Sequence, residues 1–317
     1  MQKTLEWIME GSHLAYLSSA LTFTIFVLYI LFKWIQKKHL ITQGVFIINE
    51  QFNTRNIAYM GIMIGCSVAV TVVISMTVPI TVFPPIRVAF EGIMIKITGM
   101  IFGPIVGLIV GLVTELLTML FIPSFIHPAY FFVAIGFGFW AGICSFSFKL
   151  KDNKQYITLI IITVFVIVST LFLSLTLDKL PVSNPLNEGE ITPLGYIEKV
   201  SIFGISMSRK MVPRVFMILM GIILILIYIT FAILMFTNKK KYINVIMPII
   251  LICLVTEILV SILTASWGDA ELLAKESENG YINMVALRVA QMPLKIIFNT
   301  SLLSTVYFVL RPLIKNK

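Results

Sequence analysis

The chain has 317 residues, of which 58% are hydrophobic and 12% are charged, and its mean hydropathy is +0.98. A soluble domain is less apolar and carries about twice this share of charged residues, so the composition excludes an ordinary soluble protein. The net charge of +9 does not indicate a nucleic-acid partner, because Lys and Arg lie mostly in short clusters between apolar runs, where they set membrane topology.

Nine apolar runs are predicted to be membrane-spanning helices, because about 20 apolar residues cross a hydrocarbon core of roughly 30 Å. The third run is short for a full crossing, so we expect it to tilt or to begin in the preceding loop. The predicted fold class is therefore all-α, a polytopic transmembrane helical bundle. The runs are 14–36, 57–80, 88–102, 104–121, 129–148, 157–177, 212–236, 243–265 and 284–310.

The basic residues predict a multi-pass protein of the cell membrane with its N-terminus outside and its C-terminus in the cytoplasm. In this orientation 13 Lys and Arg residues lie on inner segments and 7 lie on outer segments, as the positive-inside rule requires. Two polar stretches, 178–210 and 266–283, then become outer loops that have room for short surface helices.

Glycine recurs every four residues at the third and fourth runs, at positions 99, 103, 107 and 111. This spacing lines one side of a helix and lets another backbone approach closely, so packing inside the protein is the favoured interpretation. Gly103-Pro104 interrupts the row, because proline at a helix start favours a turn before it. The sequence therefore predicts a helical hairpin whose charged ends, near Arg87 and Glu115, meet at the outer side.

A second small-residue face lies on the predicted helix 57–80. Gly61 and Gly65 are four residues apart, and Ala58 and Ala69 extend the same face. Two interpretations stay open on these residues alone: packing within the chain, or docking to a separate membrane protein.

Five charged residues fall inside apolar runs, where charges are expensive and are expected to face protein, water or a partner. They are Lys96, Glu115, Glu257, Arg288 and Lys295. Arg288 shares one helix face with Gln291, Lys295 and Asn299. We expect Arg288 to line a cavity near the outer end and Lys295, which is deeper, to pair with Glu257.

Two proline-containing segments before the third and fifth runs hold candidate ligand contacts. The aromatic residues Phe90, Phe125 and Tyr130 are suited to stack on a planar ligand, and Arg87 and His127 to bind hydrogen-bond acceptors. The alternative for each aromatic residue, and equally for Trp267, is an anchor at the membrane interface.

The sequence offers no catalytic or metal constellation. No P-loop, HExxH, GxSxG or CxxC motif occurs, and the three cysteines lie inside apolar runs without metal-ligand spacing. We therefore expect a protein that is not an enzyme and that does not hydrolyse ATP by itself.

Taken together, the segments "RVAFEGIMIKITGMIFGPIVGLIVGLVTELL" and "FIPSFIHPAYFFVAIGFGFWAGI" resemble the centre of the S components of energy-coupling factor (ECF) vitamin transporters. The shared pattern is Arg-x-x-Phe, a glycine-proline row, an acidic residue, a loop with proline, and a glycine-rich helix. The tail "EILVSILTASWG…LRVAQMPLKIIFNTSLL" resembles the last two helices of the family, and the folate-specific branch is the most similar.

The resemblance implies a core of six helices, to which this chain adds about three. The implied parts are an extra helix and cytoplasmic linker (1–56), core helices 1–4 (57–149), an insertion of two helices and an outer loop (150–242), and core helices 5–6 (243–317).

The resemblance also implies a function and partners. The protein would bind a folate-like vitamin outside, dock through Ala58, Gly61, Gly65 and Ala69 on a transmembrane coupling subunit, and topple to release the ligand inside. Two ATPase subunits would supply the energy, and no cofactor is expected beyond the transported vitamin. The expected substrate contacts are Arg87, Phe90, Glu115, Phe125, His127, Tyr130, Trp267 and Arg288.

An anionic ligand is favoured because basic residues outnumber acidic ones in and near the membrane: Arg87, Lys96, Arg214, Arg288 and Lys295 against Glu91, Glu115 and Glu257. Other functions stay open. The architecture also suits riboflavin, pantothenate or a pyridoxine-type ligand. A stand-alone ion-coupled permease using Glu257 and Lys295, and a structural membrane protein with an extracellular partner, are the remaining classes.

Overall fold

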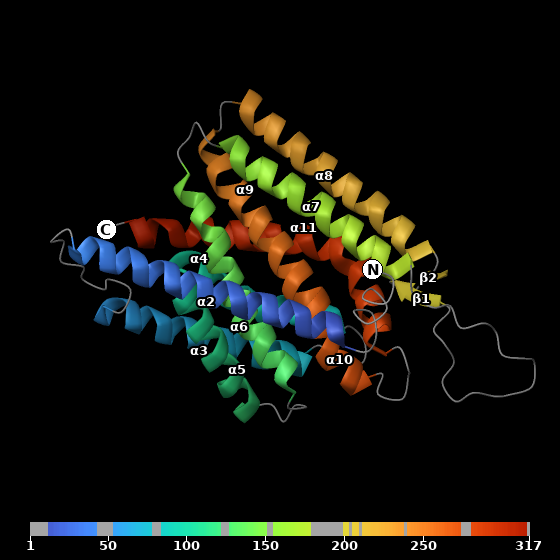
Figure 1. Ribbon diagram of the computed structural model, residues 1–317, viewed down its shortest axis with the longest axis horizontal. Coiled ribbons are helices and arrows are strands. Elements are labelled where there is room, and N and C mark those ends of the chain that lie inside the picture. Colours follow the sequence, from blue (N-terminus) through green and yellow to red (C-terminus); the bar gives the residue numbers. More distant parts are fainter. Residues whose placement is uncertain are drawn as a thin grey trace, which may run out of the picture. The chain divides into compact units, whose positions relative to one another are not determined.

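The computed structural model describes residues 12–42, 53–77, 84–121, 127–150, 155–178, 199–202, 205–208, 211–237, 240–273 and 280–315. These ranges are mostly helical (Figure 1). The helices are α2 (His13–Thr42), α3 (Thr54–Thr77), α4 (Pro84–Phe102), α5 (Pro104–Phe121), α6 (Pro128–Cys144), the short 3₁₀ segment η2 (Ser145–Lys149), α7 (Gln155–Asp178), α8 (Val212–Phe236), α9 (Lys240–Val255), the π-helix η5 (Thr256–Thr264), α10 (Ala265–Leu273) and α11 (Gly280–Lys315).

The predicted all-α membrane fold is confirmed. Eight of the described helical segments are long and apolar enough to cross a membrane, and Gly92–Phe102 in α4 is a shorter apolar helix, as its short run predicted. Each of the nine predicted runs coincides with a helix to within a few residues.

Two polar stretches that were expected to be loops with room for short surface helices contain regular structure. Within 178–210 a two-stranded antiparallel hairpin forms from β1 (Lys199–Ile202) and β2 (Ile205–Ser208), with Val200 opposite Met207. In the stretch 266–283, the helix continues to Leu273 as α10, so the loop is shorter than predicted.

The described chain divides into two compact units, which we call the N-terminal unit (Ala15–Ser145) and the C-terminal unit (Phe146–Lys317 with the residues up to Leu14). The N-terminal unit contains most of α2 and all of α3 to α6. The C-terminal unit contains α7 to α11 and the hairpin.

The N-terminal unit is organised around the glycine row. Gly103 has a positive φ of 94°, which glycine adopts without a steric penalty, and it separates α4 from α5 as predicted. A Cβ placed on Gly99 or Gly107 would collide with the backbone of Gly138 in α6, and one on Gly111 with the Ala134 carbonyl. The row therefore brings α4, α5 and α6 into backbone contact, which confirms the packing interpretation.

The additional N-terminal helix α2 packs on α6 within this unit. Phe26 and Tyr29 approach the ring of Phe139 edge-on, and Trp140 Nε1 donates a hydrogen bond to Thr22 Oγ1 at 3.1 Å. Most other side chains of α2 face outward, as expected for a helix surrounded by lipid.

The C-terminal unit surrounds the long helical segment α9–η5–α10, most of whose residues are buried. α7 and α8 lie side by side (Figure 1), where Tyr156 meets Phe231 edge-on and the hydroxyls of Thr163 and Tyr228 are 2.9 Å apart. α11 contacts α8, α9, η5 and α10, so this unit encloses its polar stripe, the face that carries Arg288, Gln291, Lys295 and Asn299.

Candidate functional site

The packing of α4, α5 and α6 brings several candidate residues to one end of the N-terminal unit. Gly107 lies against Gly138 and Gly111 against Ala134, so α5 and α6 are antiparallel. Continuing this register toward the C-terminal end of α5 places Glu115 level with Tyr130, and Thr118 level with His127. We call this region the Glu115 end of the unit.

The start of α4 lies at the same end. Gly99 contacts Gly107, so α4 and α5 are also antiparallel and the α4 positions 87–91 fall level with 115–119. Arg87 and Phe90 are therefore placed at the Glu115 end by the backbone of α4, while their side chains lie outside the described part. Phe125 lies outside the described residues altogether.

His127 starts α6 as its N-cap residue. Its backbone is extended, and Nδ1 accepts a hydrogen bond from the Ala129 amide at 3.2 Å. Because Nδ1 is an acceptor here, the neutral ring carries its proton on Nε2. The ring of Tyr130 packs edge-on against the buried imidazole, with 6.4 Å between the ring centroids, so two of the predicted ligand contacts lie side by side.

Lys96 is fully buried in the N-terminal unit. Its ammonium group lies 4.4 Å from the centroid of the Phe137 ring, within the range of a cation–π interaction. A ring face inside the protein therefore stabilises this charge.

In the C-terminal unit the predicted ion pair is confirmed. Lys295 Nζ lies 3.2 Å from Glu257 Oε1, and both side chains are buried. Removing two charges from water is expensive, and such a pair is retained because each charge is compensated by the other.

Arg288 is held by the π-helix η5 and by α10. The Ala265 amide bonds to the Val260 carbonyl, five residues back, and the return to α-helix after it leaves the Ser261 carbonyl without an intrahelical donor. Arg288 Nη1 donates to that carbonyl and to Ser261 Oγ, both at 3.0 Å. Nε and Nη2 donate to Asp269 Oδ2.

The guanidinium of Arg288 is thus engaged on all three nitrogens inside the protein. A ligand carboxylate would have to displace Asp269, a partner that sequence reasoning missed because it assigned 266–283 to a loop. Trp267 is also engaged: its indole Nε1 donates to Glu271 Oε1 at 2.9 Å, and its side chain is largely buried.

The amides of the α11 stripe differ from its charged residues. Asn299 is fully buried, and within the described residues neither its side-chain oxygen nor its nitrogen has a hydrogen-bond partner. The same holds for Oε1 of Gln291. The stripe therefore combines two ion-paired cations with amide groups that retain hydrogen-bonding capacity.

The small-residue face of α3 differs from the glycine row of α4 and α5. Ala58, Gly61, Gly65 and Ala69 are all exposed, and a Cβ added at either glycine would meet nothing within 4 Å. No described part of the chain packs on this face, so its close-approach surface is available to another molecule or to lipid.

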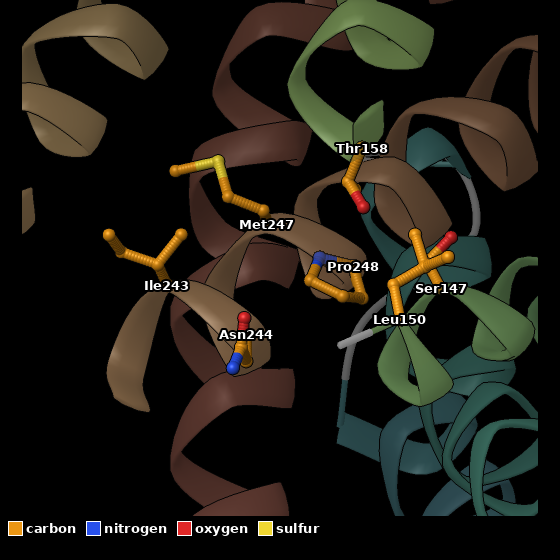
Figure 2. A pocket seen from close by; sticks show the side chains of 7 residues that line it. All are labelled: Ser147, Leu150, Thr158, Ile243, Asn244, Met247 and Pro248. Carbon is orange, nitrogen blue, oxygen red and sulfur yellow. The ribbon is translucent and has the colours of Figure 1, made fainter. Parts of the chain in front are cut away.

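One hollow lies at the start of α9 (Figure 2). Pro248 there removes the amide that would otherwise bond to the Asn244 carbonyl. The hollow has room for about one water molecule, too little for a vitamin. Its lining residues are Ser147, Leu150, Thr158, Ile243, Asn244, Met247 and Pro248.

Comparison with known proteins gives one match. The family model described as ECF-type riboflavin transporter, S component, matches residues 51–230, which is more than half of the chain. The match covers α3 to α7 and most of α8, and it ends before α9. No curated protein and no solved structure matches the chain.

Proposed function

The chain belongs to the family of S components of ECF-type riboflavin transporters, and from this premise we propose that it captures riboflavin outside the cell for import. The family match is the observation that carries the proposal. S components are transport subunits that bind a vitamin in the membrane, which agrees with a multi-pass helical protein.

The state of the buried cations supports a neutral ligand. The sequence argument for an anionic folate rested on an excess of basic residues. Arg288 is paired with Asp269, Lys295 with Glu257, and Lys96 lies on the Phe137 ring. Riboflavin is uncharged at neutral pH, whereas folates carry carboxylates, so riboflavin makes no demand on these cations. The folate branch, which the motifs favoured, becomes the second candidate.

The proposed binding site is the Glu115 end of the N-terminal unit. Glu115 is suited to accept hydrogen bonds from ring N–H groups, and Tyr130 with the aromatics Phe90 and Phe125 to stack on the planar ring. Arg87 and His127 would offer hydrogen-bond donors to the ligand.

Arg288 and Trp267 were also expected to contact the substrate, but we propose a different role for them. Arg288 and Trp267 hold η5, α10 and α11 together through Asp269, Ser261 and Glu271. We assign them a positioning role in the C-terminal unit rather than direct contact with the ligand.

The partners proposed are those of the family type: a transmembrane coupling subunit and two ATPase subunits. The exposed face Ala58, Gly61, Gly65 and Ala69 would dock on the coupling subunit, because small residues allow close helix approach in a membrane. Toppling of the S component in the membrane, with the N-terminus outside and the C-terminus inside, would then deliver the vitamin.

Ligand binding by the purified protein tests the substrate. Riboflavin fluorescence is expected to be quenched on titration with the protein in detergent, with folic acid failing to compete. A protein that binds folic acid and leaves riboflavin fluorescence unchanged would favour the folate branch. Mass spectrometry of any ligand retained during purification gives a second, independent readout.

A stand-alone permease is tested by uptake in cells that lack the coupling subunit and the ATPases. In the structure the Lys295 ammonium neutralises the Glu257 carboxylate, so this pair gives no support to a coupling-ion site. Riboflavin uptake that persists without the partner subunits would nevertheless overturn the proposed dependence on ATP.

A further inference from the structure

Three of the most deeply buried side chains in the N-terminal unit carry a hydroxyl group without a hydrogen-bond partner in the described part of the chain. They are Ser67 on α3 and Thr114 and Thr118 on α5, all more than nine-tenths buried. A buried polar group without a partner is unfavourable by about 1–3 kcal/mol. Three such groups in one small unit therefore call for an explanation.

These three hydroxyls do not make the hydrogen bond to their own helix that Ser and Thr commonly make. Ser and Thr inside helices commonly donate to the carbonyl four residues back. Thr98, Thr163 and Thr230 do so in this chain, each at 2.8 Å. Ser67, Thr114 and Thr118 stand in equally regular helices, yet their hydroxyls make no such bond.

The helix register brings the three hydroxyls to one place. Met60 and Ile64 of α3 pack in one cluster with Val106 and Val110 of α5. Tyr59 lies against Phe102, just before α5 begins, so the two helices run parallel. Ser67 lies one turn beyond Ile64, and Thr114 lies one turn beyond Val110. The apolar seam between α3 and α5 is thus followed, at its next turn, by hydroxyl groups.

The same residues also approach α6. Thr114 is three residues from Gly111, which contacts Ala134 of α6. It therefore lies between the face of α5 that packs on α3 and the face that packs on α6. Thr118 lies one turn further, level with His127 at the cap of α6. The hydroxyls therefore lie at the Glu115 end, on the buried faces of α3 and α5.

We propose that Ser67, Thr114 and Thr118 form a subsite for the polyhydroxyl side chain of the flavin. This inference rests on the proposed function and specifies how its ligand is oriented. Hydroxyls are donors and acceptors without charge, which suits a neutral polyol and neither a carboxylate nor a phosphate. The flavin ring would then lie against Glu115 and Tyr130, with its polyol chain on the buried faces of α3 and α5.

A pair of ligands separates the subsite from the ring site. Riboflavin and lumiflavin share the tricyclic ring, but lumiflavin has a methyl group in place of the polyol chain. Thr114→Val and Thr118→Val keep the shape of the side chain and remove its hydroxyl, and Ser67→Ala does the same for serine. Each variant is expected to weaken riboflavin binding roughly tenfold and to leave lumiflavin binding unchanged.

The matched control is Thr98→Val. Thr98 is a buried threonine of the same unit, but its hydroxyl is already satisfied by the Met94 carbonyl. Its replacement is expected to change the affinities for both flavins equally or not at all. Retained lumiflavin binding shows that each variant is folded.

The outcomes distinguish the two levels of the proposal. Equal effects on riboflavin and lumiflavin, or no effect on either, would overturn the subsite and leave riboflavin capture standing. A wild-type protein that binds neither flavin would overturn the proposed function and this inference with it.

Discussion

Arg288 illustrates how a cation in an apolar run can be required by the backbone around it. The π-helix leaves the Ser261 carbonyl without a donor, and the guanidinium supplies one while pairing with Asp269. A charged residue that looks like a ligand contact by position is thus part of the fold at a point where two types of helix meet.

We predict that Asp269→Ala destabilises the C-terminal unit by about 3–5 kcal/mol, because it leaves a buried guanidinium without its counter-charge. Thermal unfolding of the detergent-solubilised protein should show a clear fall in Tm. Arg214→Ala, which removes an exposed arginine of the same unit, is the control and should have little effect. Equal stability of the two variants would contradict the structural role.

Replacing Asp269 and Arg288 together tests whether the loss of stability comes from the unpaired charge. Asp269→Leu combined with Arg288→Met removes both charges, so part of the lost stability should return. Recovery is expected to be incomplete, because the Ser261 carbonyl then lacks its donor.

His127 allows its capping role and its proposed ligand role to be separated. His127→Ala removes the acceptor for the Ala129 amide and is expected to lower stability by about 1 kcal/mol. His127→Asn retains a capping oxygen, so it should restore stability. If the imidazole also contacts the vitamin, the Asn variant will be as stable as wild type but will bind riboflavin more weakly.

At the scale of elements, the molecule uses two glycine patterns in opposite ways. Gly99, Gly107 and Gly138 let the backbones of α4, α5 and α6 touch. A Cβ added at Gly61 or Gly65 of α3, by contrast, would meet nothing within 4 Å in the described chain. The four-residue spacing is the same in both, so spacing alone could not separate internal packing from an available surface.

Gly138→Ala is predicted to destabilise the N-terminal unit by about 1–3 kcal/mol. Its new methyl group would meet the Gly107 carbonyl, and the backbone can move aside only by separating α5 from α6. Gly221→Ala in α8 is the matched control, since nothing lies within 4 Å of that position and alanine favours helix. Thermal unfolding should therefore rank Gly138→Ala below wild type and Gly221→Ala at or above it.

At the scale of the whole molecule, much of the fold could be predicted because it follows from hydropathy and a few strong local signals. The nine apolar runs are helical, Gly103-Pro104 forms the turn between α4 and α5, and Lys295 forms an ion pair with Glu257. Long apolar runs and a buried charge leave few alternatives, so one sequence is enough to read them.

The parts that could not be predicted depend on neighbours or on weak local signals. The π-helix η5 has no distinct sequence pattern, so two contacts of Arg288 were missed: its hydrogen bond to the Ser261 carbonyl and its pairing with Asp269. The hairpin 199–208 lies in a stretch rich in turn-forming residues, which concealed its two short strands. Motifs shared across S components also favoured folate, while the matching family model is that of riboflavin transporters.

The docking proposal makes a prediction for the assembled transporter. Gly61→Leu and Gly65→Leu place bulky side chains on the exposed face of α3, where the structure shows open space. The isolated protein should therefore keep its stability and its riboflavin affinity. Copurification with the coupling subunit and riboflavin uptake by cells should both be lost, because the helices can no longer approach closely.

Gly221→Leu provides the control for this experiment. Gly221 is an equally exposed helical glycine with nothing within 4 Å of its added Cβ, but it belongs to α8 of the C-terminal unit and not to the small-residue face. Uptake should survive this change if docking depends on α3 in particular. Normal uptake by the Gly61→Leu and Gly65→Leu variants would show that the coupling subunit binds elsewhere, while loss of riboflavin binding by the isolated variants would place these glycines in the capture step instead.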